Sequence, residues 1–142
     1  MSHVPRKATL APTPTREARG EGARANMSAK SLGTRREYME RDFWREQGWY
    51  AIRTHDDDSA CDVIAARPDG GMAHLMLIEV KANRAGGAFH NFRPEDRRRL
   101  LEAAELAGAE AYLSWWPPHG GGLASRRFIP ARDWPKEKEV LP

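Results

Sequence analysis

Periodic and alternating apolar positions between residues 30 and 135 predict two helices and five strands. Apolar side chains at every third or fourth position indicate a helix, and short β-branched or aromatic runs indicate a strand. We expect helices over residues 31–48 and 94–108. We expect strands over residues 49–54, 61–66, 72–82, 109–116 and 126–130. This αβββαβ order with a terminal strand predicts an α/β fold in which helices flank a mixed central β-sheet.

The third expected strand ends in an apolar run that carries two charges, "HLMLIEVK". Side chains alternate faces along a strand, so Glu79 and Lys81 point the same way and Val80 points to the other face. A buried charge needs water, an opposite charge or a metal. Asp62 lies at the start of the preceding strand, and a hairpin through "RPDGG" can bring its carboxylate beside that of Glu79.

Two converging carboxylates and a lysine suit one kind of chemistry. Carboxylate oxygens favour Mg²⁺ or Mn²⁺, which takes one or two protein carboxylates together with waters and phosphate oxygens. Such an ion acidifies water and neutralises charge on a phosphodiester, while Lys81 can orient the water or stabilise the transition state. The pattern therefore favours phosphodiester hydrolysis. An ordinary solvated strand face is the alternative, because an acid and a lysine two positions apart are common on strands.

The two ends of the 142-residue chain differ from its middle. Residues 1–29 are rich in Pro, Ala, Gly, Thr and Arg and have almost no large apolar side chains, which predicts a disordered basic tail. Residues 30–135 are the expected single domain, and residues 136–142 are a short C-terminal tail. Met27 is an alternative start of translation.

Charge is unevenly distributed along the chain. The net charge is +3, but residues 1–32 hold six basic side chains against two acidic ones, so the remainder is close to neutral. Nucleic-acid contacts of the domain must therefore come from local arginines rather than from a uniformly positive surface. The one cysteine, Cys61, excludes an internal disulfide, and no apolar run approaches the roughly 20 residues of a membrane span. These features predict an intracellular, cytoplasmic protein.

Four segments occur in an order that resembles a known nuclease superfamily. They are "GTRRE" (Gly33–Glu37), "GWYAIR" (Gly48–Arg53), "CDVIA" (Cys61–Ala65) and "LIEVKA" (Leu77–Ala82). The pattern is similar to that of the PD-(D/E)xK nucleases, and in particular to the archaeal-type Holliday junction resolvases and their phage relatives. The resemblance covers the expected domain and implies a restriction-endonuclease-like core.

The resemblance implies a role for each candidate site residue. Asp62 and Glu79 match the two acids that hold the metal, and Lys81 matches the catalytic lysine. Glu37 matches an acid on the first helix that completes or supports the metal site, although an ordinary surface glutamate remains the alternative because Glu40 is close by. The family further implies a homodimer that uses Mg²⁺, with Mn²⁺ as a substitute, and that recognises branched DNA by its shape.

The loop before Asp62 departs from the family pattern. Relatives often carry a glycine-serine loop whose serine lies near the scissile phosphate, whereas this chain has "HDDDSA", with Ser59 as its only serine. The three aspartates at positions 56–58 could repel phosphate or add a metal ligand. Cys61 also stands where the motif has a proline, a variation that the superfamily tolerates.

Basic side chains near the predicted site are the candidate DNA contacts. Arginines bind phosphates independently of sequence and in a salt-sensitive way. Together with Ser59, the candidates are Arg35, Arg36, Arg53, Arg84, Arg93 and Arg97. About half of them could instead be solvated charges on helix surfaces.

The sequence thus predicts a Mg²⁺-dependent, structure-selective DNA endonuclease, and specifically a Holliday junction resolvase that cleaves four-way junctions as a homodimer. One alternative is a restriction-type or repair endonuclease of the same fold that cuts linear or flapped DNA. The other is a non-catalytic DNA-binding protein, which the intact set of Asp62, Glu79 and Lys81 disfavours.

Overall fold

The computed structural model describes residues 28–55, 57–82, 85–118 and 122–136. The helices and strands formed by these residues are α2 (Ala29–Glu46), β1 (Tyr50–Arg53), β2 (Val63–Asp69), β3 (Met72–Lys81), α3 (Pro94–Ala107), β4 (Glu110–Trp115), η2 (Gly122–Ser125), β5 (Arg127–Pro130) and η3 (Ala131–Asp133). The helices and strands follow the predicted order. The predicted N-terminal tail lies outside the described residues except at its end, where Ser28 caps α2 by accepting a hydrogen bond from the Ser31 amide.

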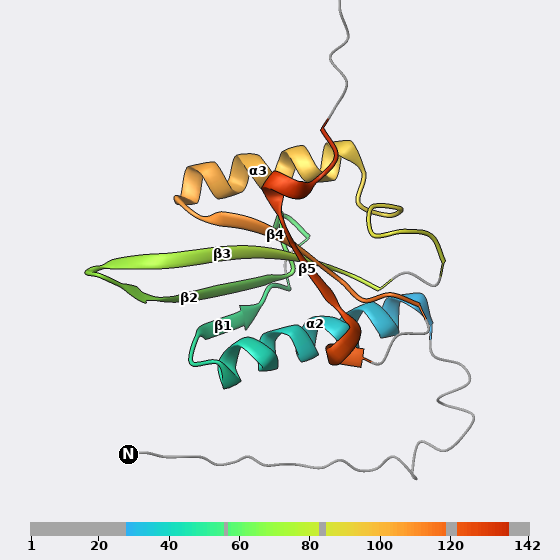
Figure 1. The fold of residues 1–142 in the computed structure, drawn as a ribbon, viewed down its shortest axis with the longest axis horizontal. Helices are drawn as coiled ribbons and strands as arrows, with labels where there is room; N and C mark the ends of the chain where they lie inside the picture. Colours follow the sequence, from blue (N-terminus) through green and yellow to red (C-terminus); the bar gives the residue numbers. More distant parts are fainter. Residues whose placement is uncertain (1–27, 56, 83–84, 119–121, 137–142) are drawn as a thin grey trace, which may run out of the picture.

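One mixed sheet forms the centre of the described fold. Its strand order is β1-β2-β3-β4-β5, and neighbouring strands are antiparallel except for β3 and β4, which are parallel. A parallel pair needs a crossover connection, and here α3 provides it. Figure 1 shows α3 above the sheet and α2 below it. The predicted α/β fold, with helices on both faces of a mixed sheet, is confirmed.

Each face of the sheet packs against its own helix through apolar side chains. The buried cluster on the α3 side includes Phe92, Leu100, Leu113 and Trp134. The buried cluster on the α2 side includes Val63, Met76, Ile78 and Trp116. Burying a side chain of this size stabilises the fold by about 1.5–3 kcal/mol, so the two clusters together hold both helices on the sheet.

The end of β3 alternates between these two clusters. Leu77 belongs to the cluster on the α3 side, whereas Ile78 and Val80 belong to the cluster on the α2 side. Since strand side chains alternate, Glu79 and Lys81 point to the α3 side, as the sequence pattern indicates. The two charged side chains therefore lie on a face that is apolar along the preceding residues and opens only at the strand end.

The hairpin between β2 and β3 is tighter than the sequence suggests. The predicted strand ends at Ala66, but β2 continues to Asp69, and the turn consists of Gly70 and Gly71 alone. Their φ angles of +60° and +86° are in the region that favours glycine. β1 pairs only as far as Ala66, so beyond it β2 is an edge strand, where Pro68 needs no ladder partner for its nitrogen.

Candidate active site

A cleft of about 880 Å³ opens where the first half of α2 meets the ends of β1 and β3 and the start of α3. It collects side chains that are far apart in the sequence. The predicted catalytic residues Glu37, Asp62, Glu79 and Lys81 all line it. The structure therefore brings these four residues to one cleft.

The β2–β3 register places the carboxylates of Asp62 and Glu79 side by side. Val63 pairs with Ile78, and the Asp62 amide donates to the Ile78 carbonyl at 2.9 Å, which extends the ladder by one residue. The Asp62 side chain accepts a hydrogen bond from the Val80 amide at 2.8 Å. That bond holds the Asp62 carboxylate across the strand end that carries Glu79 and Lys81.

Glu79 and Lys81 form an ion pair on β3. The Glu79 carboxylate lies 3.0 Å from Lys81 Nζ, and the two side chains are 14% and 25% exposed. A carboxylate and an ammonium group this far from bulk water satisfy one another, which explains why an apolar strand tolerates them. Their partial exposure leaves both groups accessible from the cleft.

Burial and neighbouring charges shift the pKa values of Asp62, Glu79 and Lys81. Burial raises the pKa of Asp62 to about 6, although the hydrogen bond from Val80 acts to lower it. Burial, and next the negative charge of Asp62, raises the pKa of Glu79 to about 8. Burial acts to lower the pKa of Lys81, but the charge of Glu79 and the hydrogen bond with it raise that pKa overall. Two buried carboxylates, of which Asp62 disfavours the ionisation of Glu79, favour a cation between them.

The carboxylate oxygens of the cleft suit a hard divalent cation that keeps part of its hydration shell. Asp62 and Glu79 offer carboxylate oxygens, and the described residues contain no group of three or more His, Cys, Asp and Glu placed to hold a metal. Mg²⁺ commonly takes one or two carboxylates and completes its octahedron with waters and phosphate oxygens. An open two-carboxylate site in a roomy cleft is therefore suited to a cation shared with a phosphate substrate.

Glu37 enters the cleft from α2 and is held by Arg53. The Glu37 carboxylate accepts a hydrogen bond from Arg53 Nε at 2.7 Å, and both side chains are largely buried. Arg53 also lies over the Tyr38 ring and contacts the His55 ring at 2.7 Å. The negative charge of Glu37 contributes to the raised pKa of Asp62, so Glu37 acts on Asp62 across the cleft.

Comparison with known proteins identifies the family. The model of the archaeal Holliday junction resolvase (Hjc) family matches residues 28–140. The chain belongs to this family. A similar solved structure is that of Archaeoglobus fulgidus Hjc, described as a Holliday junction resolvase from an archaeal hyperthermophile. The two chains are 24% identical with a TM-score of 0.57, and the match covers 77% of this chain and 80% of the other. None of the curated proteins compared with this chain matches it.

The predicted family and activity are thereby confirmed. Resolvases of this family are nucleases, and this chain is accordingly a Holliday junction-resolving endonuclease. The match begins at Ser28, one residue before α2, and runs past the last described residue. No helix among the described residues is long and apolar enough to cross a membrane.

The cleft of this resolvase contains only some of the predicted DNA contacts. Ser59, Arg53 and Arg93 line it. Ser59 donates its hydroxyl hydrogen to the Cys61 carbonyl at 2.9 Å, and Arg93 is exposed next to Asp96 at the start of α3. Arg35 does not line the cleft but lines a neighbouring hollow on α2 together with Tyr38. Arg84 lies outside the described residues.

Two of the predicted contacts instead pack within the fold. Arg97 is buried, donates a hydrogen bond to the Phe92 carbonyl, and lies 5.7 Å from the Phe89 ring. Arg36 packs on the Trp116 ring at 4.9 Å. The structure therefore does not bring these two guanidinium groups to the cleft, because Arg97 packs under the Phe89–Phe92 turn and Arg36 packs on Trp116.

Sequence reasoning missed several residues that line the cleft. They are Lys30, His55, Asp96 and Arg99. Arg99 donates to the Asp58 carbonyl at 2.6 Å, so it fastens the aspartate loop to α3. The charge of Asp96 contributes to the raised pKa values of Glu79 and Lys81. Asp96 lies three residues after Arg93, in the sequence position of a helix-capping acid. A capping position does not indicate that the start of α3 also lines the cleft.

Proposed function

We propose that Asp62, Glu79 and Lys81 are the catalytic centre with which this endonuclease hydrolyses four-way DNA junctions in a Mg²⁺-dependent reaction. The observation that carries the proposal is the meeting of two perturbed carboxylates and a lysine ammonium in one open cleft. Asp62 and Glu79 would hold Mg²⁺, or Mn²⁺ in its place. When bound, such an ion supplies positive charge against the phosphate and lowers the pKa of water.

Lys81 is assigned the positioning of the attacking water and the stabilisation of charge on the phosphate. Its raised pKa keeps the ammonium group protonated at neutral pH, so Nζ can donate hydrogen bonds to a water and to a phosphate oxygen. The ion pair with Glu79 fixes Nζ close to the carboxylate that would hold the cation. Donors fixed before the reaction need no reorganisation when negative charge develops.

Glu37 supports the metal site from α2, and its partner Arg53 binds DNA phosphate at the edge of the cleft. Arg53 holds the Glu37 carboxylate in place, so the acid faces the site in one orientation. Arg53 and Arg93 offer guanidinium donors along the cleft walls, where the Ser59 hydroxyl donates its hydrogen to the Cys61 carbonyl. Such donors give salt-sensitive affinity for the DNA backbone that does not depend on base sequence.

A homodimer is the assembly that suits this substrate. Resolution of a four-way junction needs cuts in two strands that are related by an approximate two-fold axis. The described residues of one chain contribute the cleft set out above, and a symmetric dimer would present two such clefts facing opposite ways. We propose this dimer as the active form.

A comparison of substrates tests the proposed function. The wild-type protein is incubated with a four-way junction, a matched duplex and a matched flap, with Mg²⁺ or with excess chelator. We expect paired cuts in the junction that need the metal, and much slower cutting of the duplex and the flap. Cleavage in chelator would contradict the metal dependence. Equal rates on all three DNAs would instead favour a repair or restriction-type endonuclease of this fold.

A further inference from the structure

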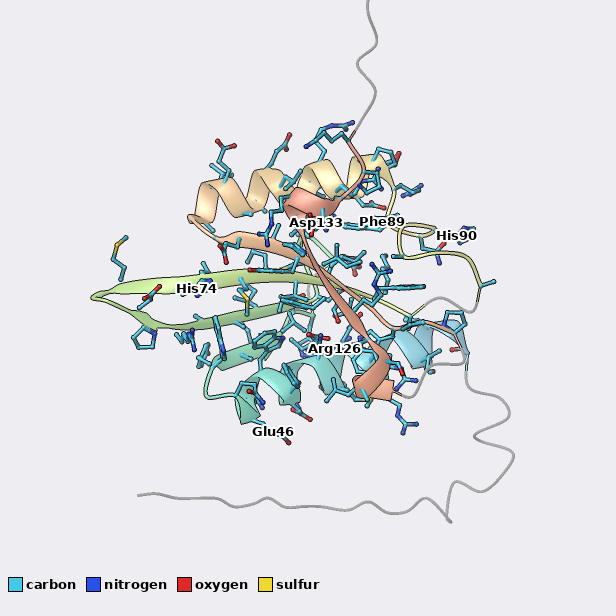
Figure 2. All side chains as sticks on the ribbon, viewed as in Figure 1. Glu46, His74, Phe89, His90, Arg126 and Asp133 are labelled. Atoms are coloured by element: carbon cyan, nitrogen blue, oxygen red, sulfur yellow. The ribbon has the colours of Figure 1, made fainter. Side chains whose placement is uncertain are left out.

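A fully buried carboxylate, Glu40, lies between α2 and the sheet. Glu40 and Ser114 have no solvent exposure, and the side chain of Arg126 is 7% exposed. Ser114 on β4 donates its hydroxyl hydrogen to Glu40, and Trp44 on α2 donates its indole N–H at 2.8 Å. Arg126 Nε lies 3.3 Å from the Glu40 carboxylate as an ion-pair partner. Figure 2 shows Arg126 on the side of the sheet that α2 covers.

Burying the charges of Glu40 and Arg126 among apolar side chains costs desolvation free energy, which suggests that the network has a role beyond stability. Apolar side chains of similar size in place of a buried ion pair are often neutral or stabilising, because desolvation offsets the attraction. The surroundings are apolar, since the Arg126 guanidinium packs 4.5 Å from the Phe43 ring and 5.3 Å from the Phe128 ring. An apolar set could not supply direction. The hydrogen bond from Ser114 on β4 to Glu40 fixes how α2 is rotated about its own axis, and Trp44, on the same helix, holds the Glu40 carboxylate in place for that bond.

The hydrogen-bond network of Glu40 lies next to catalytic residues on both α2 and β3. Glu40 is three residues after Glu37, so the two side chains lie one turn apart on the same side of α2. Ser114 pairs with Val80, the residue between Glu79 and Lys81. The hydrogen bond between Glu40 and Ser114 therefore joins the helix turn that carries Glu37 to the strand position that carries the catalytic pair.

We propose that Glu40 is a positioning residue. Through its hydrogen bond with Ser114 on β4 it sets the rotation of α2 so that Glu37 meets Arg53 and faces the cleft, while Trp44 orients the Glu40 carboxylate from the same helix. The inference rests on the proposed function, in which Glu37 supports the metal site. A misplacement of about 1 Å at a reacting group can cost up to about a hundredfold in rate. A small rotation of α2 is thus enough to slow cleavage without unfolding the protein or removing any phosphate contact.

Two matched double variants separate positioning from stability. In Glu40→Gln with Arg126→Met, the amide can accept from Trp44 and donate to Ser114, so the directed bonds remain without charge. In Glu40→Met with Arg126→Met, the same volume is filled and both bonds are lost. We expect the methionine pair to cleave a four-way junction about tenfold more slowly in single turnover than the glutamine pair. We expect their junction Kd values to agree within about twofold, since neither variant removes a phosphate contact.

Nuclear magnetic resonance checks the network independently of activity. The Trp44 indole N–H signal should stay near its wild-type position in the glutamine pair and move in the methionine pair. If the methionine pair does not fold, Ser114→Ala takes its place, because that variant removes one of the two bonds and keeps the ion pair. We expect Ser114→Ala to slow cleavage in the same direction by about threefold.

The same comparison of the two double variants, made in a protein that also carries Glu37→Gln, tests whether Glu40 influences the cleavage rate through Glu37. If Glu40 acts through Glu37, the difference between the two pairs should disappear on that background. Equal rates of the two pairs on the wild-type background would overturn the inference, as would a difference that persists in full without Glu37.

Asp62→Asn in the same assay reports on the catalytic centre itself. Normal cleavage by that variant would reject the proposed function, whereas an inactive Asp62→Asn alongside equal double variants would reject only the role of Glu40.

Discussion

Glu79 occupies a position where the folded state disfavours a negative charge. Its pKa is raised to about 8 by burial and by Asp62, from an ordinary value near 4.5. The folded protein therefore binds a proton that the unfolded chain releases between these two values. Stability must then decrease as pH rises through this window, and the decrease is absent below it, where both states are protonated. In the absence of metal, the site is a source of instability at neutral and alkaline pH.

Glu79→Gln should accordingly stabilise the metal-free protein at high pH. The amide cannot ionise, so we expect a gain of about 2 kcal/mol at pH 8 that shrinks towards zero near pH 4.5. Urea unfolding at several pH values in chelator measures the change, with Glu46→Gln at the exposed end of α2 as the control. A gain that is the same at all pH values, or a loss at pH 8, would show that the charge of Glu79 is not destabilising.

At the scale of elements, hydrophobic patterning predicts which helices and strands form but not where pairing makes them end. The positions of Asp62, Glu79 and Lys81 follow from strand alternation and one hairpin, both of which are local properties. The extension of β2 through Pro68 depends on where β1 stops pairing, which no local pattern records. In the same way, Arg97 resembles a surface residue in sequence and is buried because the Phe89–Phe92 turn folds over it.

The glycine turn of the β2–β3 hairpin gives a test at this scale. Gly71→Val places a β-branched residue at φ +86° and should lower the free energy of unfolding by about 1–2 kcal/mol. Gly70→Asn creates an Asn-Gly pair, which suits both positive φ angles, and should be close to neutral. Urea unfolding compares the two. Because the turn is at the far end of β3 from the cleft, cleavage by both variants should be unchanged (Figure 1). Equal stabilities would contradict the proposed turn geometry.

At the scale of the whole molecule, the fold separates arginines that can meet DNA from arginines that hold the structure. A nearly neutral domain must bind an anionic junction through local contacts, and the cleft gathers Arg53 and Arg93 beside the carboxylates. Sequence could not make this separation, because both kinds lie on helices and loops with similar composition. Whether a guanidinium group lines the cleft decides in which kind we place it.

Arg93→Gln should therefore affect junction binding, whereas Arg97→Met should affect the stability of the fold. Removing the exposed Arg93 side chain should weaken junction binding and reduce the slope of log Kd against log salt by about one, with little loss of stability. Removing Arg97 leaves the Phe92 carbonyl without its donor and should cost about 1–3 kcal/mol of stability, with the salt slope unchanged. Fluorescence anisotropy at several salt concentrations, together with urea unfolding, measures both quantities. A reduced salt slope for Arg97→Met would place its guanidinium group on the DNA.

The most direct test of the account is the single-turnover cleavage of a four-way junction by Asp62→Asn in Mg²⁺. Asparagine keeps the shape of the side chain and removes the charge that would hold the cation. We predict a loss of about a thousandfold or more in the cleavage rate constant, with a junction Kd close to that of the wild type and normal cleavage by the Glu46→Gln control. Cleavage by Asp62→Asn at the wild-type rate would contradict the assignment of this cleft as the catalytic centre.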